Sequence, residues 1–141
     1  MRRKISRIKA MFYLYQNDLC NEVTEFDHFD NLLSEVDNLE YDEKLYKSIV
    51  SGVIENMARI DRLIAISLTN YTIDRLSYVD RCLLRIGTFE MLYTDTPKAI
   101  IINEIIELSK EYSEIDNFHS SKFNNSLLDT IRKRIEANDK K

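Results

Sequence analysis

Glycine and proline are almost absent from this chain, and their scarcity limits the folds that it can adopt. Only two Gly and one Pro occur among its 141 residues. An all-β fold needs many tight turns, and these two residue types supply much of the backbone geometry that such turns require. The composition therefore predicts an all-α protein.

Apolar residues recur three and four residues apart along most of the chain, which is the spacing of one face of a helix. About seven helices are expected, at residues 3–17, 25–36, 43–58, 60–68, 78–93, 97–112 and 121–136. No segment rich in Gly, Pro or Ser divides the chain. We therefore expect one domain over residues 1–141, a helical bundle of two fused parts at about 1–70 and 71–137.

Several residues at the expected helix starts have the side chains that cap a helix. Asp42 precedes residues 43–58, and Ser77 stands three residues before Asp80, which is the spacing of a capping box. Thr96 followed by Pro97 is a further start signal, because proline suits the first helical position. These signals favour a helix over a strand for residues 97–112.

The expected helix at residues 78–93 is apolar on most sides, which predicts a central helix with neighbours on several flanks. Gly52 lies inside another expected helix, where glycine costs about 1 kcal/mol relative to alanine. We infer that a second helix crosses closely at Gly52. The polar residues expected on the remaining strip of the central helix are Arg81, Arg85 and Thr88.

Charge is distributed unevenly, although the net charge is only −4. Residues 2–9 contain five Arg or Lys and no acid, whereas residues 18–43 contain ten Asp or Glu and no Arg or Lys. A basic cluster on the outer side of the first helix is suited to phosphate contacts. An ordinary solvated helix face is the alternative interpretation.

Nothing in the sequence indicates an active site, a metal or a cofactor. His28 and His119 have no Cys, Ser or Asp at the spacing of a triad or a metal site. We interpret Cys20 and Cys82 as small apolar residues of a cytoplasmic protein. No apolar stretch approaches the roughly 18–20 residues that cross a membrane. We therefore expect no catalytic residue, no cofactor and no membrane contact.

Three segments of the sequence resemble the NusB family, and together they span nearly the whole chain. The first has the basic start Arg2-Arg3-Lys4-Ile5-Ser6-Arg7 followed by Leu14-Tyr15-Gln16. The second comprises residues 75–87, 89–93, 97 and 102–110. The third, residues 122–129, is similar to the family's box Lys-Phe-Val-Asn-Gly-Val-Leu-Asp. It departs from that box at Asn124 and Ser126, where the family usually has an apolar residue and glycine.

This resemblance implies an antitermination factor that binds boxA RNA in nascent transcripts together with NusE, a small-subunit ribosomal protein. Such a factor supports transcription of ribosomal RNA and joins the RNA polymerase antitermination complex indirectly; a homodimer is also possible. NusB-like modules occur in ribosomal RNA methyltransferases too, but no glycine-rich cofactor loop is present here. A helical protein–protein adaptor without direct RNA binding is the alternative function.

The predicted RNA-binding residues come from the first and third segments and are expected to form one continuous platform. They are Arg2, Arg3, Lys4, Arg7, Tyr15, Lys122, Phe123 and Asn125. Tyr15 and Phe123 are equally compatible with core positions. The residues predicted to contact a protein partner are Asp80, Arg81, Arg85 and Glu90. Arg85 and Glu90 are also compatible with internal ion pairs to Glu104 or Glu107.

Overall fold

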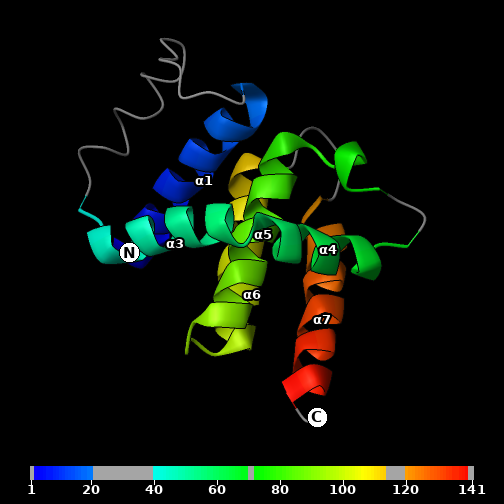
Figure 1. The fold of residues 1–141 in the computed structure, drawn as a ribbon. Helices are drawn as coiled ribbons and strands as arrows, with labels where there is room; N and C mark the ends of the chain where they lie inside the picture. Colours follow the sequence, from blue (N-terminus) through cyan, green and yellow to red (C-terminus); the bar gives the residue numbers. More distant parts are fainter. Residues whose placement is uncertain (1, 21–39, 70–71, 114–119, 140–141) are drawn as a thin grey trace.

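The computed structural model describes residues 2–20, 40–69, 72–113 and 120–139, and these residues form a bundle of helices (Figure 1). The elements are α1 (Arg2–Cys20), α3 (Glu43–Glu55), α4 (Met57–Ser67), the 3₁₀ turn η1 (Ile73–Arg75), α5 (Tyr78–Tyr93), α6 (Lys98–Tyr112) and α7 (Ser120–Asp139). The described ranges contain no strand, so the all-α prediction is confirmed. The helix expected at residues 25–36 lies outside the described residues.

The caps predicted at Asp42 and Ser77 are confirmed. The Asp42 side chain accepts a hydrogen bond from the Leu45 backbone N–H at 3.0 Å, and Ser77 accepts one from Asp80 at 3.1 Å. The Thr96 cap is wrong, because α6 begins after Pro97 without a side-chain cap. Thr96 Oγ1 instead accepts a hydrogen bond from Arg3, which ties the loop before α6 to α1.

Helix α5 lies at the centre of the bundle, as predicted from its apolar surface (Figure 1). It packs against each of the other five described α-helices, and every residue from Cys82 to Met91 is buried. The close crossing inferred at Gly52 is also confirmed, because a Cβ atom there would collide with the Phe89 ring. The expected polar strip is not exposed, however, since Arg85 and Thr88 are buried.

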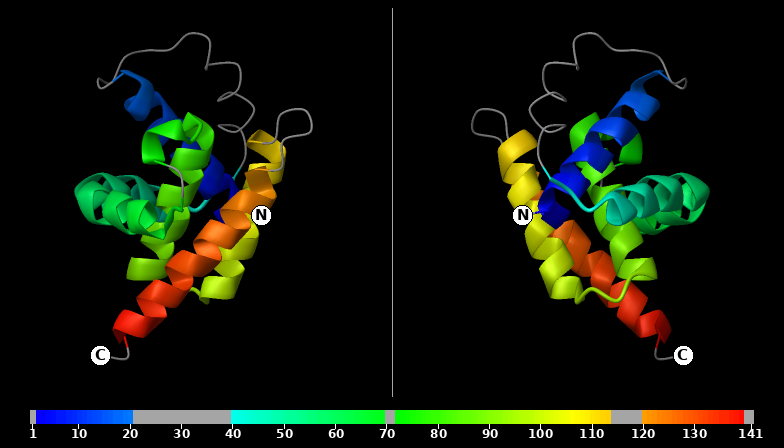
Figure 2. Two further views of the ribbon diagram at one scale, coloured as in Figure 1. Left: turned by 90° about the vertical axis from the view of Figure 1, so that its right-hand side faces the viewer. Right: turned by 90° about the vertical axis from the view of Figure 1, so that its left-hand side faces the viewer.

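The arrangement around α5 brings several helix ends together. Helices α3 and α4 cross one side of α5, whereas α6 and α7 pack side by side on another side (Figures 1 and 2). The C-terminal ends of α1 and α6 lie at the same end of the bundle as the N-terminal ends of α5 and α7 (Figure 1). Segments far apart in the sequence therefore meet at that end.

In the described part of the chain, no helix combines the length and the hydrophobicity that crossing a bilayer requires.

The side chains that fill the interior are mainly aliphatic and come from every described α-helix. The largest fully buried ones include Met11, Ile49, Ile64, Leu83, Ile105 and Leu128.

Candidate nucleic-acid interface

The basic start of α1 faces a shallow hollow beside α6. The hollow is lined by Arg2, Arg3, Lys4, Arg7, Thr96, Ile100 and Glu104. Arg2 and Arg3 are exposed, and Arg3 Nη2 donates a hydrogen bond to Thr96 Oγ1 at 3.2 Å. Several cationic groups therefore lie along one edge of the molecule. Arg3 is tied to the loop before α6.

Lys4 extends this edge toward the C-terminal end of α6. Its Nζ atom lies 2.7 Å from Glu111 Oε1, and the two side chains are 28% and 45% exposed. The hydrogen bond to Glu111 raises the pKa of Lys4, so the amine is charged at neutral pH. An exposed pair of this kind contributes only about 0–1 kcal/mol to stability. Lys4 can therefore exchange Glu111 for a phosphate at little cost.

Arg7 does not lie on the outer face of α1, so that prediction is wrong. It is 2% exposed, and its Nε and Nη2 atoms donate hydrogen bonds to Glu90 of α5 at 2.7 and 2.8 Å. Burial opposes the charge on Arg7, but the Glu90 carboxylate outweighs this and raises the pKa of Arg7. The sequence does contain an indication that Arg7 is buried. Met11 and Leu14 follow Arg7 at helical spacing, so the three residues share one face of α1, and Met11 and Leu14 are also buried.

Tyr15 lies in an aromatic cluster at the end of the bundle where the helix ends meet. Its ring is half-buried and lies edge-on to that of Tyr78, with 6.2 Å between ring centroids. The rings of Phe12 and Tyr112 make a similar contact at 5.8 Å. An apolar hollow beside these rings is lined by Met11, Phe12, Tyr15, Val79 and Tyr112. Tyr15 thus packs against neighbouring helices and still presents part of its surface.

The first turns of α7 present the other predicted residues. Lys122, Phe123 and Asn125 are exposed, and Phe123 keeps 36% of its surface in contact with solvent. Asn124 lies among them in sequence but is fully buried. The helix therefore turns Asn124 into the bundle and the other three side chains away from its centre.

The two predicted RNA-binding regions lie on either side of α6 (Figure 1). On one side α1 reaches α6 through the Lys4–Glu111 and Phe12–Tyr112 contacts. On the other side α7 packs along α6, and Asn124 Nδ2 donates a hydrogen bond to Ser109 Oγ at 3.0 Å. The two regions are therefore joined through α6, which α1 reaches from one side and α7 from the other.

The predicted partner-binding strip on α5 is largely internal, which corrects the expectation that it is exposed. Asp80, Arg85 and Glu90 are 6%, 7% and 0% exposed. Arg81 keeps more contact with solvent, with 14% of its side chain exposed. The strip is covered because α1, α4 and α7 all pack on α5. Of these four residues, Arg81 is thus the best placed to contact another protein.

Arg85 forms an internal ion-pair network rather than a surface contact. It donates two hydrogen bonds to Asp61 of α4, at 2.8 and 2.9 Å, and lies 3.3 Å from Asp18 of α1. The alternative of an internal pair is therefore correct for Arg85, but its partners are not Glu104 or Glu107. The network joins α1, α4 and α5.

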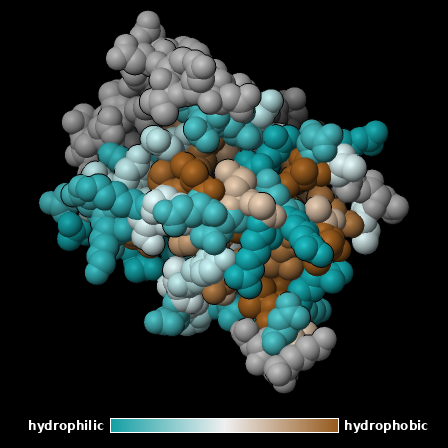
Figure 3. Space-filling view, in the orientation of Figure 1, coloured by the Kyte–Doolittle hydropathy of each residue, from teal (hydrophilic) through white to brown (hydrophobic). Residues whose placement is uncertain are grey.

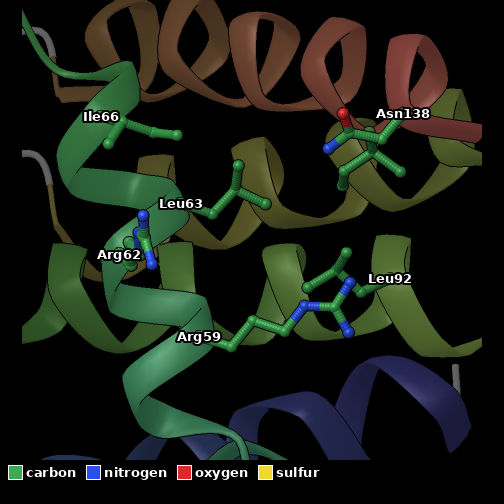
Figure 4. A pocket seen from close by; sticks show the side chains of 7 residues that line it. Arg59, Arg62, Leu63, Ile66, Leu92 and Asn138 are labelled. Carbon is green, nitrogen blue, oxygen red and sulfur yellow. The ribbon is translucent and has the colours of Figure 1, made fainter.

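A groove that the sequence did not predict lies between α4, the end of α5 and α7 (Figure 4). Its floor contains Leu63, Leu92 and Ile135, and Ile66 at its edge is 52% exposed. Arg59 and Arg62 of α4 flank it. Figure 3 shows hydrophobic surface over this side of the molecule, among mostly hydrophilic residues.

The described residues include no group of three or more His, Cys, Asp or Glu side chains placed to hold a metal ion. Cys82 is completely buried in the core, and burial raises the pKa of its thiol to about 12. The thiol is therefore protonated at neutral pH and unsuited to nucleophilic chemistry. Its position agrees with the interpretation of Cys82 as a small apolar residue.

Together these features define a small all-α protein in which the central helix α5 packs against both α1 and α7. The basic start of α1 lies on one side of α6, and the start of α7, with exposed Lys122 and Phe123, lies on the other. Comparison with known proteins identifies its relatives. The family model described as the NusB family matches residues 4–133. The chain therefore belongs to the NusB family.

Individual relatives agree with this assignment. The transcription antitermination protein NusB of Staphylococcus aureus (strain MRSA252) is 34% identical over 133 residues, which cover 94% of this chain and 100% of that protein. The one of Fervidobacterium nodosum is 38% identical over 82% of this chain and 84% of that protein. A crystal structure of antitermination factors NusB and NusE in complex with dsRNA matches with a TM-score of 0.74 and 28% identity, over 93% of this chain and 96% of that one.

Proposed function

We propose that this protein is a transcription antitermination factor that binds boxA-type RNA together with NusE and supports transcription of ribosomal RNA. The observation that carries the proposal is the position of two exposed regions, the basic start of α1 and the Lys122–Asn125 stretch of α7, on either side of α6. The NusB and NusE proteins of the matching crystal structure are bound to RNA. We propose no catalytic activity, and we expect the protein to act in the cytoplasm.

The two regions supply different parts of RNA recognition. Arg2, Arg3 and Lys4 provide charge for phosphates, a contribution that does not depend on the base sequence. Phe123 provides an exposed ring on which an unpaired base can stack, which contributes about 1–3 kcal/mol per base. Tyr15 adds the exposed part of its ring at the end of the bundle where α7 begins. Arg7 contributes indirectly, because its bond to Glu90 holds α1 against α5.

A titration of fluorescently labelled boxA RNA, with and without purified NusE, tests this proposal. We expect the wild-type protein to bind the RNA and to bind it more tightly when NusE is present. The double variant R3A/K4A should lose affinity, because it removes two phosphate contacts. The variant K44A/K47A removes the same charge from exposed positions of α3 and should bind like the wild type.

A helical adaptor that binds proteins but not RNA is the second candidate. The observation that favours it is the apolar groove in Figure 4, with exposed Ile66 and its flanking arginines. The same titration separates the two functions. If NusE binds while boxA RNA does not, in either the presence or the absence of NusE, the adaptor is correct and the proposal of RNA binding is wrong.

A further inference from the structure

The ends of three helices meet at the carboxylate of Asp80. Ser77 caps the start of α5 by accepting a hydrogen bond from the Asp80 backbone N–H. Ser113, which follows α6, donates its hydroxyl to Asp80 Oδ1. Asn124, near the start of α7, donates from Nδ2 to the same Oδ1 atom at 2.9 Å and to Ser109 Oγ at 3.0 Å. One side chain of α5 therefore holds both α6 and α7.

This cluster is shielded from water. Asp80 and Ser113 are 6% and 7% exposed, and Ser109 and Asn124 are fully buried. Hydrogen bonds to a charged group are stronger than those between neutral groups, and they are directional. Apolar side chains would hold the helices together without such directional contacts, and they would allow the helices more freedom to slide and rotate.

The buried amide of Asn124 contains an unpaired polar atom, which an apolar side chain at this position would not have. Its Oδ1 atom is buried and has no hydrogen-bond partner among the described residues. A buried unpaired acceptor is destabilising, so stability alone gives little reason for an amide at this position. The amide does, however, orient this turn of α7 through two hydrogen bonds.

The orientation of α7 determines where its exposed side chains point. Consecutive helical residues are rotated by about 100° around the helix axis. With Asn124 directed at Asp80, Phe123 and Asn125 must project to either side, and both are exposed. A rotation of α7 would move the Phe123 ring relative to Tyr15 and Lys4 on the other side of α6.

We propose that Asp80 is a positioning residue for RNA binding. It touches no RNA; through Asn124 and Ser113 it holds the start of α7 on the end of α6, so that Lys122 and Phe123 keep their orientation relative to α1. This inference rests on the proposed function, because it concerns the same RNA-binding regions. It replaces the role of Asp80 as a direct contact for a protein partner.

A double-mutant cycle on boxA RNA affinity tests this role. D80A, which removes the oxygen that accepts from Ser113 and Asn124, should weaken binding by roughly tenfold, a coupling within the range for residues joined in one network. In the K122A/F123A background, D80A should cause no further loss, because the side chains through which Asp80 acts are gone. N124V should weaken binding of the wild-type background in the same way, and it serves if D80A does not fold.

A matched control separates positioning from stability. D61A removes a carboxylate from the Arg85 network on the other side of α5, so it should lower the melting temperature without any coupling to K122A/F123A. Equal losses from D80A in both backgrounds, or full RNA affinity of both D80A and N124V, would overturn the inference while the proposed function stands. Failure of the wild-type protein to bind boxA RNA would overturn both.

Discussion

The two buried carboxylates of α5, Glu90 and Asp80, hold different helices by different chemistry. Glu90 meets the Arg7 guanidinium of α1 in a two-bond ion pair, with both groups almost fully removed from water. Asp80 meets a hydroxyl and an amide, which carry no charge. In the first junction each buried charge is compensated by the opposite charge of its partner. In the second, two neutral groups contribute.

Because of this difference, the two sides of the proposed RNA-binding surface should respond differently to mutation. Loss of one member of a buried ion pair leaves an uncompensated charge. Loss of one neutral donor leaves the Asp80 carboxylate with the other. We therefore expect the attachment of α1 to be essential for stability, and the attachment of α7 to affect mainly geometry.

The largest effect is expected for R7M. This variant leaves Glu90 buried without its cation, which should lower the free energy of unfolding by about 3–5 kcal/mol in urea denaturation. R7M/E90L, which replaces both charges by apolar side chains, should recover most of that loss. If R7M has nearly the stability of the wild type, the junction is not the charged anchor that we describe.

A smaller effect is expected for D80A at the second junction. It leaves the Asn124 and Ser113 donors unsatisfied, which should cost about 1–3 kcal/mol in the same denaturation experiment. N124V should be close to neutral, because it also removes the unpaired amide oxygen. The proposed difference between the two junctions is wrong if D80A proves more destabilising than R7M.

The smallest effect is expected at the surface, for E111Q. This change releases Lys4 from its ion pair and should increase boxA RNA affinity by at most about fivefold, because an exposed pair contributes about 0–1 kcal/mol. The gain should shrink as salt is added. E43Q, which releases Lys47 on α3, is the matched control and should not change RNA affinity. A loss of affinity for E111Q would show that Glu111 itself assists binding.

Local features of the sequence predicted much of the fold. Asp42 and Ser77 cap their helices through neighbouring residues, so their roles are visible in the sequence itself. Gly52 indicated a close crossing, and Phe89 fills the space beside it. The apolar surface of residues 78–93 identified the central helix. These features depend on residues within a few turns, or on a face whose burial is evident from its composition.

The contacts that were missed join residues far apart in the chain. Arg7 and Glu90 are 83 positions apart, and Asp80 and Asn124 are 44 positions apart. A charged residue in a basic cluster looks exposed until its buried partner is known. Asn124 was recognised as a departure from the family box, but the reason for it appears only when Asp80 is placed opposite. Helix periodicity alone could have placed Arg7 on the face of Met11 and Leu14.

The salt dependence of boxA RNA binding shows whether exposed cations on both sides of α6 contact one RNA strand, and the proposed function depends on that arrangement. For single strands, removal of one phosphate contact should reduce the slope of log affinity against log salt by about 0.7. K4A and K122A should each reduce the slope, and their combination should reduce it by the sum. If K122A leaves the slope unchanged while K4A lowers it, the RNA does not reach α7 and the proposed continuous surface is wrong.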